Sequence, residues 1–552
     1  MKRALTIAAS ALAVGAGLLA APGNGAAASP ASAASSASAS STIPAYTPPP
    51  LAWGTCTSKR LQDAGAQCAL MTVPLDYARP RGAKIKIAVS RVLHTDADYK
   101  GMIAVNPGGP GGSGLNYSVL GGSIPNGVGA KYDWYGFDPR GVGSSQPSLS
   151  CNPNYPGAGY NRPNYVPNRA ADRNWWLRVT AKYARDCGRS DARALLRHIK
   201  TTDVARDLDS LRRAAGQEKL NYYGFSYGTY LGQVYATLFP QRVGRFVWDG
   251  VLNAKNAFYR ANVEQNVAFD QNINRYFGYL AQNNATFGLG RTASLVRQGY
   301  YRQLRLLDRR PAAGGRLGPD ELTDVLQSAA YYVYSWVELG QAYAKLVKTG
   351  DGTDVLAQYA GPGDDNGFAV YNAVQCTDAK WPNQQRTFAD TRRTYAKHPF
   401  LAWSNTWYNA PCLTWPAPAR NAVTVSGKAV KTPILMIAET YDAATVYSGA
   451  LATRKAFPTS YLIEGVGGTT HSGSLSGIAC TDDTIASYLD TGELPARAAG
   501  NRSDQQCAPV PAPQPTATAA LRARQGASST AVRDRMPADL RAGLQEAQLI
   551  GR

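Results

Sequence analysis

The stretch from Leu220 to Pro240, LNYYGFSYGTYLGQVYATLFP, most constrains the fold of this chain. Its first six residues are typical of a buried strand, and apolar residues then recur at helical spacing until proline ends the pattern. Between the two patterns, Ser226 has a glycine two positions before it and another two positions after it. This spacing lets a sharp strand-to-helix turn close and present a serine hydroxyl. The stretch therefore indicates an α/β fold with a nucleophile at the turn.

Strand-like segments recur on both sides of this stretch. They are rich in β-branched residues and bounded by Pro or Gly, and they lie at 68–75, 83–94, 101–109, 132–143, 244–252, 431–439 and 459–466. We expect the first two to pair antiparallel. The later segments are apolar on both faces and alternate with helical patterns such as 201–216, which favours a parallel sheet covered on both sides.

The chain divides by composition into six segments. The fourth is helical in pattern and rich in tyrosine, and it falls between two predicted sheet strands, so we expect a helical lid over the strands' carboxyl ends. Within the last, residues 537–550 have the pattern of a short amphipathic helix. The segments are a signal peptide (1–28), a pro-segment or linker (29–50), the first part of the core (51–254), the lid (255–425), the second part of the core (426–510) and a flexible basic tail (511–552).

The N-terminus has the build of a secretory signal peptide. Met1-Lys2-Arg3 supplies positive charge, residues 4–20 form an uncharged apolar run, and Ala26-Ala27-Ala28 offers a small-residue cleavage site. The apolar run is too short for a membrane span, and no other stretch is long and apolar enough. We therefore expect a secreted, extracellular protein.

The eight cysteines agree with export, since an even count in a secreted chain suggests disulfides. No C-x-x-C pair exists, which argues against zinc ribbons and thioredoxin chemistry. Spacing alone allows about 105 pairings. Pairing between sequence neighbours is the expectation, as Cys56–Cys68, Cys151–Cys187, Cys376–Cys412 and Cys480–Cys507.

The formal net charge of +20 raises the question of nucleic-acid binding. No basic run is interleaved with aromatic residues, as a nucleic-acid groove would need. We expect no nucleic-acid partner, and a loose association of the basic tail with an anionic cell wall. The basic residues are scattered or collect near the C-terminus, at Arg522, Arg524, Arg533, Arg535 and Arg541.

A serine becomes a nucleophile when a base takes its proton, and the base needs an orienting acid. The chain has four histidines. His471 follows the last predicted strand in the glycine-rich loop GVGGTTHSGSLSG and is the candidate base. Structural or surface roles are expected for the other three, His94, His198 and His398.

The acid should lie between the serine and the histidine in the chain, the order found in α/β-hydrolases. Asp442 follows the strand-like segment 431–439 by a short loop and is the favoured acid. Glu439, at the end of that segment, is the competitor. Asp442 also has the position of a cap for the helical pattern that follows, a role compatible with catalysis.

A glycine-rich loop, NPGGPGGSG at 106–114, begins where an apolar strand ends. A tetrahedral oxyanion needs backbone N–H donors that approach closely, and glycine allows that approach. In such folds one donor comes from this loop and the other from the residue after the nucleophile. We therefore expect Gly109 and Tyr227 to form the oxyanion hole. The loop does not contain the phosphate-binding motif G-x-x-x-x-G-K-[ST], which argues against a phosphate site.

These motifs make the chain similar to a known family. NPGGPGGSG, GFDPRGVG, ARDLDSLRRAAG…KLNYYGFSYGTYLG, CTDAKWP and the Asp442 loop resemble the secreted bacterial tripeptidyl aminopeptidases, which are α/β-hydrolases related to the prolyl aminopeptidases. The resemblance covers roughly residues 50–510. It implies an α/β-hydrolase fold, removal of tripeptides from free N-termini without metal or organic cofactor, and Ser226, Asp442 and His471 as the triad.

Two features depart from the family. An acidic residue often precedes CTDAKWP, whereas this chain has Gln375, and the tail after 510 is longer than usual. An exopeptidase must hold the substrate's ammonium group, most simply with a buried carboxylate. Asp378 and Glu264 are candidates, although either residue also fits an ordinary salt bridge.

Two other functions remain open at this point. An esterase or an amide or lactone hydrolase acting on a small molecule would use the same triad, since the lid sets the substrate. A surface-binding protein that retains the fold is the other alternative, and a complete triad speaks against it.

Overall fold

The computed structural model describes residues 46–155, 162–359, 364–515 and 534–548, which belong to one compact unit, Pro44–Arg552. The predicted signal peptide, most of the predicted linker (29–50), and Arg522, Arg524 and Arg533 of the predicted tail lie outside the described residues.

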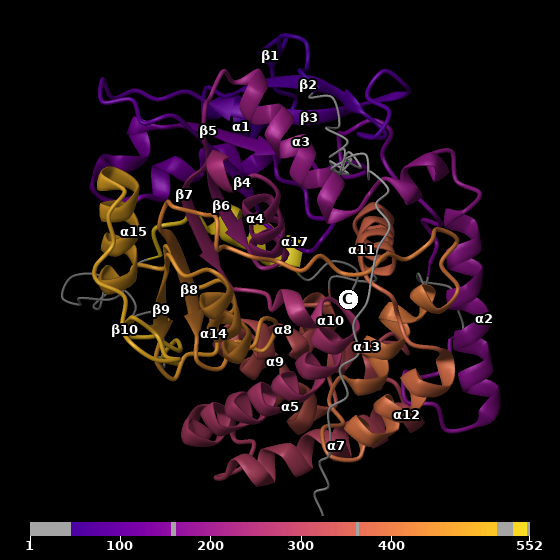
Figure 1. Ribbon diagram of the computed structural model, residues 1–552. Coiled ribbons are helices and arrows are strands. Elements are labelled where there is room, and N and C mark those ends of the chain that lie inside the picture. Colours follow the sequence, from indigo (N-terminus) through magenta and orange to yellow (C-terminus); the bar gives the residue numbers. More distant parts are fainter. Residues whose placement is uncertain (1–45, 156–161, 360–363, 516–533, 549–552) are drawn as a thin grey trace, which may run out of the picture. The chain divides into compact units, whose positions relative to one another are not determined.

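The described strands form one ten-stranded sheet in the order β1-β2-β3-β5-β4-β6-β7-β8-β9-β10 (Figure 1). The pairs from β1 to β5 along this order are antiparallel, and every pair from β5 to β10 is parallel. The mostly parallel sheet is thus confirmed, with β10 as an added edge strand. The bounds are β1 Gly54–Thr55, β2 Gln67–Pro74, β3 Lys84–Val92, β4 Met102–Asn106, β5 Asp133–Phe137, β6 Leu220–Phe225, β7 Val243–Asp249, β8 Ile434–Glu439, β9 Ser460–Gly465 and β10 Gln505–Cys507.

The central strands are buried on both faces, which explains their nearly continuous apolar sequences. In β4, Met102 and Ala104 join one hydrophobic cluster, and Ile103 and Val105 join another. Successive side chains of a strand point to opposite faces, so each face needs its own cover. Helices α3 (Thr201–Ala214) and α4 (Tyr227–Leu238) contribute to the first cluster, and α15 (Ala479–Thr491) contributes to the second.

Between β7 and β8 the chain makes a helical insertion, as the sequence predicts. Figure 1 shows α5, α7, α12 and α13 grouped below the sheet in this view. Phe269, Tyr276 and Leu326 belong to a separate hydrophobic cluster, most of whose residues come from the insertion. The helices are α5 Tyr259–Gln282, α6 Asn284–Phe287, α7 Ala293–Arg309, α8 Pro319–Tyr331, α9 Trp336–Thr349, α10 Thr353–Ala357, α11 Asp365–Asp378, α12 Gln384–Tyr395 and α13 Ala402–Asn409. Outside the insertion lie α1 Lys59–Asp63, α2 Ala170–Cys187 and α14 Tyr447–Ala456.

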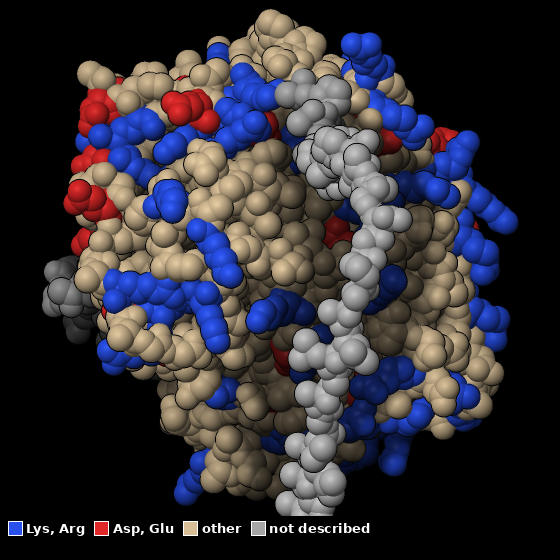
Figure 2. Space-filling view, viewed as in Figure 1, with Lys and Arg blue, Asp and Glu red and all other residues tan. Residues whose placement is uncertain are grey.

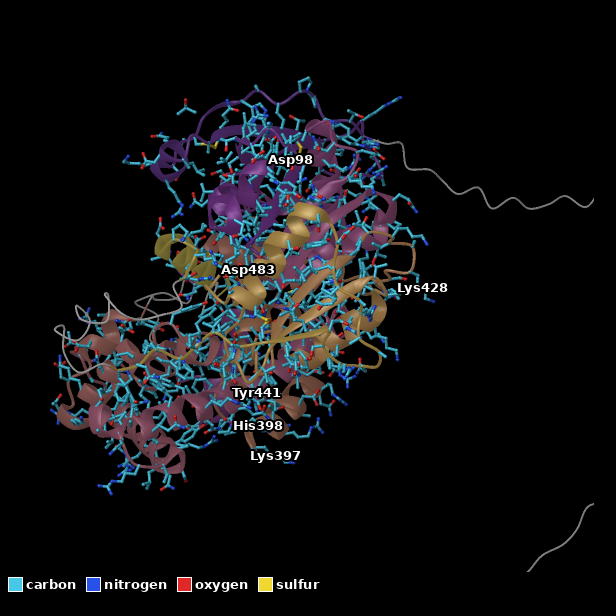
Figure 3. The ribbon with its side chains drawn as sticks, turned by 90° about the vertical axis from the view of Figure 1, so that its left-hand side faces the viewer. Asp98, Lys397, His398, Lys428, Tyr441 and Asp483 are labelled. Atoms are coloured by element: carbon cyan, nitrogen blue, oxygen red, sulfur yellow. A yellow bond between two sulfur atoms is a disulfide. The ribbon has the colours of Figure 1, made fainter. Side chains whose placement is uncertain are left out.

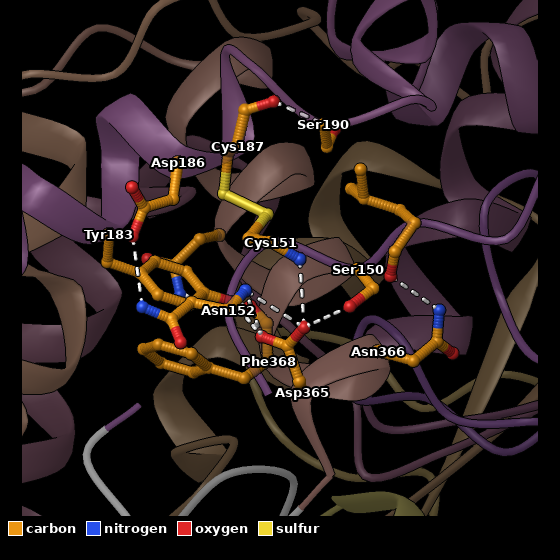
Figure 4. The surroundings of a disulfide bond; sticks show 12 residues. Ser150, Cys151, Asn152, Tyr183, Asp186, Cys187, Ser190, Asp365, Asn366 and Phe368 are labelled. Atoms are coloured by element: carbon orange, nitrogen blue, oxygen red, sulfur yellow. Dashed lines mark hydrogen bonds between the residues drawn. A yellow bond between two sulfur atoms is a disulfide. The ribbon is translucent and has the colours of Figure 1, made fainter. Parts of the chain in front are cut away.

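Four disulfides join sequence neighbours, Cys56–Cys68, Cys151–Cys187, Cys376–Cys412 and Cys480–Cys507. The second ties the loop after β5 to the end of α2 (Figure 4). Asp365, at the start of α11, accepts hydrogen bonds from the backbone N–H of Cys151 at 2.8 Å and the hydroxyl of Tyr183 at 2.8 Å. The disulfide therefore anchors a point where the core and the insertion meet.

The C-terminal segment differs from the predicted flexible tail. Residues 534–548 are described, and they include α17 (Ala538–Gln548), the expected amphipathic helix. Its Leu540 and Leu544 are buried in the cluster that covers the α15 face of the sheet. Arg541 is buried and bonded, and Arg535 pairs with Asp482. Apolar residues at helical spacing give this segment a face to bury, which the tail's composition alone does not reveal.

Candidate active site

Ser226 occupies the sharp turn between β6 and α4. Its backbone has φ 54° and ψ −123°, a left-handed conformation that costs a non-glycine residue energy and recurs at functional sites. Its N–H donates to the carbonyl of Asp249 at the end of β7, at 2.9 Å, and its carbonyl accepts from Thr229 at 2.8 Å. The serine side chain is thus held at the carboxyl ends of the parallel strands.

The glycine-rich loop after β4 lies directly against this turn. Gly108 has φ +102°, and a Cβ on it would lie 2.7 Å from the carbonyl of Phe225 and 3.2 Å from the backbone nitrogen of Tyr227. Only glycine permits this approach. Gly109, Ser226 and Tyr227 line the same cavity. Tyr227 begins α4, where a backbone N–H has no acceptor within the helix.

His471 and Asp442 are in direct contact. His471 Nδ1 lies 2.7 Å from Asp442 Oδ2, and because a carboxylate only accepts, Nδ1 is the donor. The imidazole is 1% exposed, and among the described residues its Nε2 has no hydrogen-bond partner. Asp442 Oδ1 accepts the backbone N–H groups of Ala444 and Thr445, each at 2.9 Å. These bonds fix the carboxylate and leave one imidazole nitrogen available.

The end of β7 lies against both the serine turn and the histidine loop. Gly250 has φ +71°, and a Cβ on it would lie 2.8 Å from His471 Cε1. The preceding residue, Asp249, holds the Ser226 N–H. The side chain of Asp249 accepts the N–H of Ser474 at 2.8 Å, and burial raises its pKa to about 6. The serine turn and the histidine loop therefore adjoin the same short segment, Asp249–Gly250.

Glu439, the competing acid, has a different place. It is buried at the end of β8, and its carboxyl accepts the N–H of Thr470 at 2.5 Å and that of Val510 at 2.8 Å. Burial raises its pKa to about 8. The carboxyl thus supports the residue before His471 rather than the imidazole itself. The structure also leaves α14 uncapped by Asp442, since that helix begins only at Tyr447.

The other three histidines lie in different surroundings. His94 Nδ1 is 2.7 Å from Asp133, and His398 Nδ1 is 3.4 Å from Asp270 within the insertion, where Figure 3 labels it. Burial lowers the pKa of His198. The structure pairs neither His94 nor His398 with the serine turn.

The insertion holds both the acid loop and the histidine loop. Asn272 of α5 donates to the carbonyl of Tyr441 at 2.8 Å and to that of Thr469 at 3.4 Å. The carbonyl of Tyr331, the last residue of α8, accepts the N–H of His471 at 2.9 Å. Lid helices therefore hold the backbone just before the acid and the histidine, and that of His471 itself, a role that loop sequences do not reveal.

The cavity at Ser226 has neutral walls. None of the described residues that line it is Asp, Glu, Lys or Arg. Gln375 accepts a hydrogen bond from Asn262 at 3.0 Å, and Gln265 presents a buried oxygen without a partner among the described residues. The lining side chains that sequence reasoning missed are Leu252, Phe258, Ala261, Asn262, Gln265, Tyr331, Tyr371, Tyr408, Ala444, Thr445 and Gln548.

The two suggested amine-binding carboxylates do not line this cavity. Asp378 accepts both the N–H (2.9 Å) and the hydroxyl of Thr201 at the start of α3, and burial raises its pKa to about 7. Glu264 is one third exposed and accepts from Asn256 at 2.7 Å. Asp378 contacts the serine turn indirectly. Its carboxyl binds the Thr201 hydroxyl, and that hydroxyl also contacts the hydroxyl of Tyr227, the residue after Ser226, at 2.6 Å.

Two further observations concern the distribution of basic residues on the surface and the hydropathy of the helices. Figure 2 shows Lys and Arg spread across the viewed face rather than gathered in a single groove. No helix in the described part of the chain is long and apolar enough to cross a membrane.

Comparisons with known proteins agree with the architecture. Residues 398–518 match the family model described as TAP-like protein. Tripeptidyl aminopeptidase of Streptomyces lividans is 38% identical over 84% of this chain and 87% of the relative. Serine protease Hip1 of Mycobacterium tuberculosis is 30% identical (81% and 90% covered), and carboxylesterase B of that species is 28% identical (81% and 89% covered). The chain therefore belongs to the tripeptidyl aminopeptidase family and is a serine hydrolase of the aminopeptidase class with an α/β-hydrolase fold.

Proposed function

We propose that this protein is an extracellular serine exopeptidase that releases tripeptides, or similarly short peptides, from free N-termini through an acyl-enzyme. Ser226 is the nucleophile, His471 the base and Asp442 the orienting acid. The observation that carries the proposal is the His471–Asp442 hydrogen bond of 2.7 Å, in a loop that contacts the same Asp249–Gly250 segment as the strained turn at Ser226. Peptidase relatives support the choice of a peptide substrate.

The chemistry follows from the donors and acceptors. With Nδ1 committed to Asp442, His471 Nε2 takes the proton of the Ser226 hydroxyl as the oxygen attacks the scissile carbonyl. The backbone N–H groups of Gly109 and Tyr227 stabilise the negative oxygen that forms. The imidazolium returns the proton to the leaving amine. Water, activated by the same histidine, then hydrolyses the ester on Ser226.

The extracellular location rests on two features. The N-terminal sequence has the pattern of a signal peptide, and the structure contains four disulfides. Disulfides persist in oxidising compartments outside the cytosol. Expression with the native N-terminus, followed by N-terminal sequencing of protein in the medium, tests export and the cleavage site together.

The catalytic assignment is tested on the nucleophile. We expect Ser226→Ala to abolish both hydrolysis of a tripeptide-chromophore substrate and labelling by a fluorophosphonate. Ser190→Ala, which removes a serine that hydrogen-bonds the carbonyl of Cys187, is the matched control and should keep both. Full activity of the Ser226 variant would refute the assignment. Mass spectrometry of products from one free-amine peptide gives the length of peptide removed.

A second candidate, a small-molecule esterase or amide hydrolase, is favoured by one observation. The described lining of the cavity has no carboxylate to hold a substrate ammonium group. An esterase would turn over simple esters and accept N-acetylated and free peptides equally. A peptidase that releases only short N-terminal fragments, with negligible turnover of simple esters, would exclude this candidate.

A further inference from the structure

The C-terminal helix α17 lies beyond the part of the chain that the family model matches, which ends at residue 518. It nevertheless packs against the elements that carry the proposed catalytic groups. A Cβ on Gly112, in the glycine-rich loop, would lie 2.7 Å from the Cβ of Ala547. This helix therefore lies directly against the proposed oxyanion loop.

Arg541 joins α17 to the loop that follows His471. Its guanidinium donates to the carbonyl of Ser474 at 3.0 Å and to that of Ser472 at 3.4 Å. It also pairs with Asp534 at 2.9 Å, and it is only 5% exposed. A buried guanidinium with a planar set of donors fixes several acceptors at once, which a surface charge does not do.

Gln548 joins three parts of the site. Its side-chain amide donates to the Ser472 hydroxyl at 2.9 Å and to the carbonyl of Pro107, in the proposed oxyanion loop, at 3.3 Å. Its oxygen accepts the hydroxyl of Tyr332, from the lid, at 2.6 Å. Gln548 also lines the cavity at Ser226. One amide thus connects the histidine loop, the oxyanion loop and the lid.

The histidine loop has a particular need for such support. Ser472 has φ 54° and Leu475 has φ 59°, so two non-glycine residues close to His471 are in the left-handed region. Strained residues keep such conformations only when their surroundings over-determine them. Arg541 and Gln548 bond to Ser472, and the backbone N–H of Arg535 donates to the carbonyl of Leu475 at 3.0 Å.

We propose that α17 is a working part of the active site, in which Arg541 and Gln548 are positioning residues. They hold the histidine loop in register with the oxyanion loop, and Gln548 also forms part of the substrate cavity wall. The inference rests on the roles proposed above for His471 and Gly109. It assigns a function to a segment whose sequence reads as a tail.

The test uses the full chain with Arg541→Ala and Gln548→Ala, and with Glu546→Ala as the matched control. Glu546 lies on the same helix and is exposed. Active sites are counted by fluorophosphonate titration, and kcat per titrated site and KM are measured on a tripeptide-chromophore substrate. We expect kcat per site to fall about 100-fold for Arg541→Ala, the loss that a misplacement of about 1 Å produces. Gln548→Ala should lower kcat by about tenfold and change KM as well, since it also touches the cavity.

A purely structural role predicts another result. It would reduce the number of titratable sites and the melting temperature while kcat per site stayed at the wild-type value, and that result would overturn the proposal. If Arg541→Ala does not fold, Gln548→Ala decides, because the helix keeps its buried leucines; wild-type kcat and KM would then overturn it. An active Ser226→Ala enzyme would instead refute the proposed function itself, so the two failures are distinct.

Discussion

Gln375→Glu should turn the cavity at Ser226 into one that selects strongly for a free amino terminus. Gln375 lines a cavity whose described walls bear no charge, and its side-chain oxygen accepts from Asn262 at 3.0 Å. Glutamate has the same shape, and its carboxylate still accepts from Asn262. The substitution therefore adds charge with little change in packing.

The magnitude follows from the kinds of hydrogen bond involved. An amide oxygen that binds an ammonium group already forms a hydrogen bond with one charged partner, and such bonds contribute about 1.5–3 kcal/mol. A carboxylate in its place adds a second, opposite charge, and two unit charges about 4 Å apart near a protein surface attract by up to about 4 kcal/mol. The variant should therefore widen the preference for a free over an N-acetylated tripeptide substrate by at least about threefold, because about 1.4 kcal/mol corresponds to tenfold.

The assay compares kcat/KM for a tripeptide-coumarin substrate with a free and with an acetylated N-terminus. The ratio of the two values cancels the cost of burying the new carboxylate in the empty enzyme. Glu264→Gln is the control, since Glu264 does not line the cavity and should leave the ratio unchanged. A ratio that stays within twofold of wild type in a folded Gln375→Glu enzyme would refute the idea that this side chain faces the substrate's N-terminus.

Three further predictions test the acid, the buried carboxyl and a disulfide. Asp442→Asn should lower kcat by roughly 10³- to 10⁴-fold with little change in KM, because the wrong tautomer of His471 results; Glu439→Gln should lose less than about tenfold, and equal losses would contradict the assignment. The Glu439 carboxyl keeps its proton up to about pH 8 when folded but loses it near pH 4.5 when unfolded. Stability should therefore fall as pH rises through that window, and Glu439→Gln should show a smaller decrease in melting temperature between pH 5 and pH 8; an unchanged decrease would be the contrary result. Replacing Cys151 and Cys187 together by serine opens a loop of 36 residues and should lower the free energy of unfolding by about 4 kcal/mol, read from denaturant titration; a loss below about 1 kcal/mol would contradict this loop-closure account.

The strands and the serine turn were predictable because local pattern determines them. A strand buried on both faces must be apolar throughout, and the turn at Ser226 needs small residues at fixed offsets. Such signals lie within a few residues of each other. The antiparallel pair β2 and β3 and the helical insertion between β7 and β8 followed from the same local patterns.

The walls of the cavity were not predictable in the same way. Asn262, Tyr371 and Tyr408 come from three separate lid helices or their ends, and helical periodicity does not say which face of a helix meets a distant strand. The contacts of Asp378 could not be predicted from its local sequence either. Its sequence neighbourhood suggested a substrate contact, but its two oxygens bind Thr201 at the start of α3.

The C-terminal helix α17 combines a locally predictable pattern with a position that only the fold determines. Its apolar spacing was visible in the sequence, but basic composition suggested a solvated tail, and only the fold shows that Leu540 and Leu544 are buried beneath the sheet. With those side chains buried, the last turn of α17 lies beside the histidine and oxyanion loops. Gln548 then contributes an amide to a cavity that already holds Gln265 and Gln375. Because these three amides come from the tail and from two lid helices, the polar lining of the cavity depends on tertiary packing rather than on any one motif.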